Sequence, residues 1–118
     1  MSLKIEVTEK TPQNLDDLLL TIFWKEPEVA KIAIDFLKTI KEWSRSETPY
    51  TVDQWKQYIT RHDLTQSTYH NMLKRLRRAG MIEKVYNKGS GKHELRPSKN
   101  FSDVLASMHA VWDDYLKS

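Results

Sequence analysis

The first half of the chain repeats apolar residues at helical spacing. The first stripe consists of Leu15, Leu18, Leu19, Ile22 and Phe23. A capping pair of Asn14 and Asp17, three positions apart, precedes this stripe. The helix is expected to end before Pro27. A second helix with Pro27 in its first turn is predicted next. Its core-facing stripe consists of Val29, Ile32, Ala33, Phe36, Leu37, Ile40 and Trp43.

Residues 3–9, "LKIEVTE", alternate apolar and polar positions, which predicts a short strand. From Thr51 onward the pattern predicts two short helices. Thr51 with Gln54 resembles a capping box, and "RHD" at 61–63 separates this helix from one capped by Thr65. Gly80 is suited to end that helix in a left-handed conformation. The two inward stripes are Trp55, Tyr58 and Ile59, then Tyr69, Met72 or Leu73, and Leu76. Two short helices joined by a turn predict a helix-turn-helix unit.

Two strand-like runs follow, "MIEKVYN" and "KHELRP", on either side of "KGSG". The glycines predict a hairpin tip, so residues 81–97 are expected to form a basic wing. A last helix is predicted from Asn100, with Asp103 three positions later as its capping partner.

The apolar stripe of this last helix is wider than one small core normally covers. We interpret the excess, together with part of the first helix, as a homodimer surface. The alternative is that the last helix folds back on its own core. The candidate dimer residues are Phe23, Trp24, Phe101, Leu105, Met108, Trp112, Tyr115 and Leu116.

The composition fits one compact domain of 118 residues with 39% apolar content. Because the chain has no cysteine, disulfides, thiolate nucleophiles and cysteine-based zinc sites are excluded. No apolar run approaches the roughly 18 residues of a membrane span, and the start lacks the apolar core of a signal peptide. We therefore expect a soluble, cytoplasmic protein without a membrane partner.

The net charge of +3 is unevenly distributed. Residues 1–50 carry −2, residues 51–100 carry +7 and residues 101–118 carry −2. A basic middle between acidic flanks is typical of a chain whose centre meets a polyanion, although scattered solvated lysines would give the same totals.

The stretch "TVDQWKQYITRHDLTQSTYHNMLKRLRRAGMIEKVYNKGSGKHELRPS" resembles the winged helix-turn-helix of prokaryotic, particularly archaeal, transcriptional regulators of the MarR, ArsR and penicillinase-repressor type. The resemblance implies a mainly α fold with a small β-hairpin wing. The single domain 1–118 would then comprise an N-terminal extension (1–26), a winged helix-turn-helix core (27–98) and a C-terminal helix (99–118). It also implies sequence-selective binding of double-stranded DNA, with helix 65–79 in the major groove.

The residue types on the outward side of helix 65–79 suit that role. Gln66 and Asn71 could pair with adenine and Lys74 with guanine, while Ser67 or Thr68 could bind a phosphate at the helix N-terminus. The full set of candidate DNA-binding residues is Thr65, Gln66, Ser67, Thr68, His70, Asn71, Lys74, Arg75, Arg77, Arg78, Lys88, Lys92 and Arg96.

Other interpretations remain open for several of these residues. Arg77 and Arg78 could complement the negative end of the helix or pair with acids, and His70 could be an ordinary surface histidine. A winged helix can also serve as a protein-interaction or RNA-binding subunit of a transcription or replication assembly.

Enzymatic chemistry has little support. The four histidines lack H-x-x-x-H spacing, and no glycine-rich phosphate loop precedes a helix. We therefore expect no enzyme activity, no metal and no cofactor. The operator and any small-molecule effector stay unknown.

Overall fold

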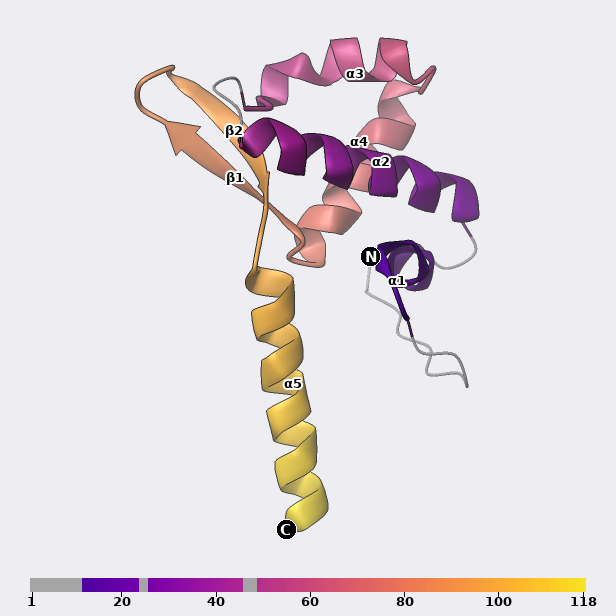
Figure 1. Cartoon of the computed structure of the whole chain (residues 1–118), viewed down its shortest axis with the longest axis vertical. Helices are drawn as coiled ribbons and strands as arrows, with labels where there is room; N and C mark the ends of the chain where they lie inside the picture. The colour runs from indigo at the N-terminus through magenta and orange to yellow at the C-terminus, as the bar shows by residue number, and fades with distance from the viewer. Residues whose placement is uncertain (1–11, 24–25, 46–48) are drawn as a thin grey trace.

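The computed structural model describes residues 12–23, 26–45 and 49–118. The strand predicted at 3–9 and the dimer residue Trp24 lie outside the described residues. The elements in chain order are α1 (Leu15–Ile22), α2 (Pro27–Ser44), the 3₁₀ turn η1 (Val52–Gln54), α3 (Trp55–Arg61), α4 (Gln66–Arg78), β1 (Ile82–Asn87), β2 (Lys92–Pro97) and α5 (Asn100–Lys117) (Figure 1). The fold is mainly helical with one antiparallel hairpin, in a winged-helix-like layout.

Side-chain caps define the starts of α1, η1 and α4, and a proline opens α2. The Asn14 side chain accepts a hydrogen bond from the Asp17 amide at 2.9 Å, and Pro27 occupies the first turn of α2. Thr51 and Gln54 form the predicted capping box, but around η1, after which α3 begins directly at Trp55. The predicted starts of α1 and α2 and the end of α1 before Pro27 are confirmed.

Aromatic rings form the centre of the core. Phe36 of α2 meets Tyr50, Tyr58 and Tyr69 edge to face at centroid distances of 5.3–5.9 Å. The hydroxyls of Tyr50 and Tyr69 lie 2.8 Å apart in the buried interior. Burial raises the pKa of both phenols, so each stays neutral and available for this hydrogen bond. Ring packing and one satisfied polar pair thus hold α2, the segment before η1 and α4 together.

A third extended segment borders the hairpin. The Leu95 amide donates to the Tyr50 carbonyl at 2.9 Å, and Thr51 forms an isolated antiparallel bridge with Glu94. The sequence pattern did not predict this pairing, which fixes the base of the wing to the start of the helix-turn-helix. The register within the hairpin places Ile82 opposite Pro97 and Asn87 opposite Lys92.

Gly80 ends α4 and also contacts the first turn of α5. Its φ of +79° confirms the predicted left-handed stop, and its carbonyl accepts from the Phe101 amide at 2.9 Å. The predicted cap at Asn100 was wrong, because Asn100 is already helical and its amide donates to Ser98 Oγ at 3.1 Å. The start of α5 is therefore held by Gly80 and Ser98.

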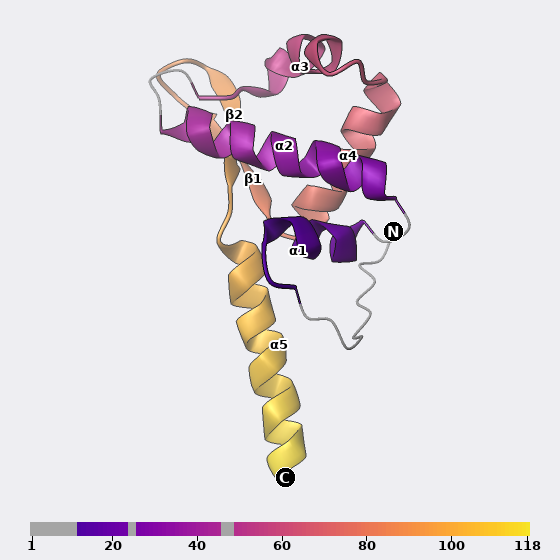
Figure 2. The same ribbon diagram turned by 45° about the vertical axis from the view of Figure 1, so that its right-hand side comes forward.

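Helix α5 extends away from the other helices and the hairpin in both ribbon views (Figures 1 and 2). No residue of α5 is buried within the described part of the chain, although Phe101 packs partly against the core. The alternative in which the last helix folds back on its own core is therefore wrong. Phe23 was also misassigned to the dimer surface, since it is 0% exposed and belongs to the core.

Candidate nucleic-acid interface

The two sides of α4 differ sharply in burial. Tyr69, Met72 and Leu76 are buried, and Leu73 is half-buried at the edge of the core. This settles the choice between Met72 and Leu73 as the deeper residue. The opposite side presents polar and basic side chains, of which Asn71 is half-buried and the others are exposed: Gln66, Ser67, His70, Asn71, Lys74, Arg77 and Arg78.

A left-handed residue and a threonine cap precede α4. Asp63, in the turn between α3 and α4, adopts a φ of +52°, the left-handed region in which Asp and Asn are tolerated. The Thr65 hydroxyl then accepts from the Thr68 amide at 3.1 Å and lies 2.8 Å from the Thr68 hydroxyl. These two threonines are therefore engaged in capping, whereas Ser67 is exposed in the first turn at this positive helix end.

His70 leans back along the helix. Its Nδ1 lies 2.9 Å from the Gln66 carbonyl, and its ring centroid lies 5.7 Å from that of Trp55. Because a carbonyl only accepts, Nδ1 carries the proton in this contact, which leaves Nε2 for another partner. The imidazole is thus oriented by its own helix and by α3.

Arg75 lies on the flank of α4, one turn from Asn71 and Arg78, and its side chain turns toward the N-terminal helices. Its guanidinium pairs with Glu26 just before α2 and lies 5.2 Å from the ring centroid of Phe23. Its side chain is only 18% exposed. Arg75 therefore joins α4 to the N-terminal helices, and its guanidinium is engaged there rather than presented beside the other predicted DNA contacts.

The wing is a tight basic turn. Asn87 Oδ1 accepts from the Gly89 amide at 2.8 Å, and Gly91 closes the turn with a φ of +72°. Lys88 is exposed in this turn.

Lys92 forms an exposed ion pair of 3.2 Å with Asp53 of η1. A hydrogen bond from Thr51 and this ion pair lower the pKa of Asp53, so the Asp53 carboxylate that pairs with Lys92 is held in its ionised form.

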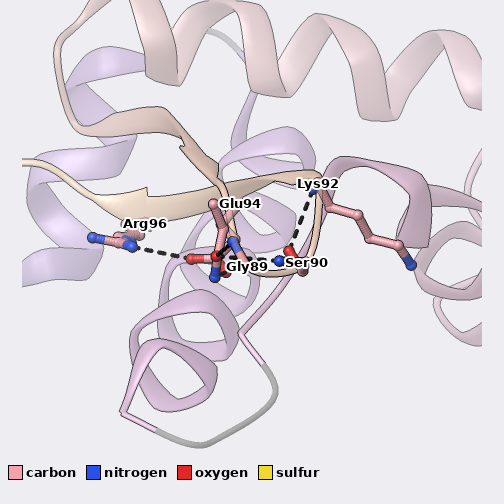
Figure 3. A network of polar contacts seen from close by, with 6 residues as sticks. Gly89, Ser90, Lys92, Glu94 and Arg96 are labelled. Carbon is pink, nitrogen blue, oxygen red and sulfur yellow. Dashed lines mark hydrogen bonds and ion pairs between the residues drawn. The ribbon is translucent and has the colours of Figure 1, made fainter.

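The base of the wing contains a buried carboxylate. Glu94 is 3% exposed and accepts a hydrogen bond from the side-chain Nδ2 of Asn87 at 2.7 Å. It also accepts one from the Arg96 guanidinium at 3.0 Å (Figure 3). These donors, Asn87 first and then Arg96, lower the pKa of Glu94. Arg96 is therefore already engaged in holding the wing together.

Sequence reasoning missed one exposed pair on the wing. Tyr86 and His93 lie directly opposite each other in the register, with ring centroids 5.1 Å apart. Both residues are exposed, Tyr86 at 52%. The signal was present, because a four-residue turn at 88–91 pairs Asn87 with Lys92 and hence Tyr86 with His93.

Comparison with known proteins gives one match. A family model described as an archaeal family matches residues 12–116. The chain belongs to this archaeal family. The span that the archaeal family shares includes α4, the wing and nearly all of α5. No curated protein and no solved structure matches the chain.

Within residues 12–23, 26–45 and 49–118, no three His, Cys, Asp or Glu side chains cluster in a way that could hold a metal ion. In the same ranges, every helix is too short or too polar to cross a membrane.

Proposed function

We propose that the chain is a sequence-selective double-stranded DNA-binding protein that regulates transcription as a homodimer. The observation that carries the proposal is the exposed side of α4, which is polar and basic from Gln66 to Arg78 while its other side is buried. The basic wing follows α4 directly. A B-form major groove about 12 Å wide admits one α-helix with such a side turned to the base edges.

The proposed contacts divide into two groups. Gln66, Asn71 and Lys74 read base edges, since their amide and ammonium groups match adenine and guanine in the major groove. His70 Nε2 adds a further polar contact. The phosphate contacts are Ser67, Arg77, Arg78, Lys88 and Lys92. Arg75, Arg96, Thr65 and Thr68 support this surface through the contacts described above rather than forming it.

Selection from a random DNA pool tests the sequence preference. Purified protein is expected to enrich an inverted repeat whose half-sites lie about 34 Å apart, because a two-fold dimer presents two α4 helices. A pool that stays unenriched while bulk duplex still binds would remove the base-reading role and leave a non-specific binder.

Two matched variants distinguish the proposed base contacts from the proposed phosphate contacts. Asn71→Ala is expected to reduce discrimination at one position by about 1–3 kcal/mol, whereas Lys88→Ala weakens binding to all duplexes alike. Equal effects of both variants on selected and random duplexes would contradict the division of contacts.

RNA competitors test the alternative of an RNA-binding subunit. The deep, narrow major groove of A-form RNA excludes α4, so double-stranded RNA should compete weakly. Stronger competition by RNA than by DNA of the same length would favour the RNA-binding alternative.

A further inference from the structure

The unpartnered surface of α5 has heptad spacing. Val104, Met108, Val111 and Tyr115 recur at intervals of four, three and four residues, which places them on one seam of the helix. A shallow, mostly apolar hollow runs along this seam from Val104 to Tyr115. The opposite side is mostly polar or small and carries the His109–Asp113 ion pair of 3.3 Å. Leu116, seven residues after His109, also lies there and is 62% exposed.

The apolar side chains of α5 are strongly exposed. Val111, Trp112 and Tyr115 are 71%, 61% and 64% exposed. Val104, Leu105, Met108 and Leu116 are 43%, 39%, 53% and 62% exposed, so α5 carries a continuous run of exposed large apolar side chains. A standard interface takes roughly 800 Å² from each partner and places such residues at its centre. Patches of this kind on soluble chains mark association sites.

The two flanks of the seam are unequal. Leu105 and Trp112 lie on one flank, and Ser107 and Asp114 lie on the other. In a parallel pair of identical helices, each apolar flank faces the partner's polar flank. In an antiparallel pair, apolar flank faces apolar flank and polar faces polar. The antiparallel arrangement therefore buries Leu105 against the partner's Trp112.

Side-chain sizes and charges agree with that direction. With α5 fully overlapped, antiparallel pairing sets Val104 against the partner's Tyr115, and Met108 against the partner's Val111, so large residues meet smaller ones. It also separates the two acidic ends at Asp113 and Asp114, which a parallel pair would bring together. The opposed helix dipoles favour the same arrangement.

We propose that α5 pairs with α5 of a second copy as an antiparallel two-helix coil along Val104, Met108, Val111 and Tyr115. The 18-residue helix spans roughly 27 Å at 1.5 Å per residue. The remaining parts of the two protomers then lie at opposite ends of the coil. The consequence for DNA rests on the proposed function: the coil is the spacer that separates two half-sites by about one turn.

Cysteine cross-linking tests the direction, since the natural chain has no cysteine. Ser107→Cys and Asp114→Cys change polar flank residues and are mixed as purified full-length proteins with a short bismaleimide. The antiparallel coil predicts a 107–114 cross-linked dimer by mass spectrometry. The matched control mixes Ala106→Cys, on the outer side of α5, with Asp114→Cys and should give little product. Preferential linking of Ser107→Cys to Trp112→Cys, or no cross-linked dimer, would overturn the proposal.

A seam variant tests whether the coil forms the dimer. Val111→Asp should convert a sedimenting dimer to a monomer at micromolar concentration, while Ala106→Asp should remain dimeric. Both should keep the wild-type circular dichroism, because neither side chain is buried in the protomer. A wild-type monomer, or a dimer that survives Val111→Asp, would refute the coil.

Anisotropy with duplex DNA distinguishes the two proposals. Binding by a chain that fails the cross-linking test would remove the coil and keep the DNA function. A 107–114 product without any duplex binding would remove the DNA function and keep the coil.

Discussion

The neighbouring cations Lys74 and Arg75 are predicted to have opposite roles. Arg75 pairs with the half-exposed Glu26 and lies against the Phe23 ring. The ion pair is worth about 0.5–1 kcal/mol after solvent screening, and the cation–π contact adds about 0.5–1 kcal/mol. Arg75→Ala should therefore lower the free energy of unfolding by roughly 1–2 kcal/mol, or Tm by about 4–8 °C for a chain of this size.

Lys74→Ala is the matched control. Lys74 is exposed on the polar side of α4, so its loss should change stability by less than about 0.5 kcal/mol. It should instead weaken binding to the selected duplex by roughly 1–3 kcal/mol. Thermal unfolding and duplex anisotropy are measured on both variants. An Arg75→Ala protein with unchanged Tm and reduced DNA affinity would refute the assignment, because it would place this guanidinium at the DNA.

Three further changes test the fold. Gly80→Ala should lower stability by about 1–2 kcal/mol in denaturant unfolding, since a Cβ at φ +79° is strained and would lie 3.2 Å from the Phe101 amide; an unchanged midpoint would contradict this. Tyr69→Phe should lose about 1–3 kcal/mol by leaving the Tyr50 hydroxyl unsatisfied, and the double Phe variant should recover part of that loss. Glu94 has a lowered pKa, so its contribution is present above the ordinary Glu pKa of about 4.3 and is lost as pH falls through the folded value. Glu94→Gln should flatten the acid side of the Tm profile, and an unaltered slope would count against the network.

The sequence predicted features that depend on local chemistry. Thr65, Gly80 and the glycine-containing wing turn each act through neighbours within a few residues, so their spacing alone was sufficient. The outward side of α4 was also predictable, because helical periodicity separates Tyr69 and Leu76 from the polar residues.

Two of the misses arose from contacts between distant segments, and a third arose locally. Arg75 resembled its basic neighbours in sequence, and only the packing of α4 beside Glu26 and Phe23 separates it from them. The short pairing of Tyr50 and Thr51 with β2 involves too few residues to show a strand period. The predicted cap at Asn100 was wrong because the hydroxyl of Ser98, two residues earlier, accepts a hydrogen bond from the Asn100 backbone amide.

The salt dependence of duplex binding tests the central claim most directly. If each protomer neutralises about four phosphates, the logarithm of affinity should fall with the logarithm of salt concentration at a slope near −3.6 per protomer, and near −7 for the dimer. Fluorescence anisotropy with a labelled duplex between low and physiological salt gives this slope. A slope near zero, or no binding below about 10 μM protein at low salt, would contradict the account.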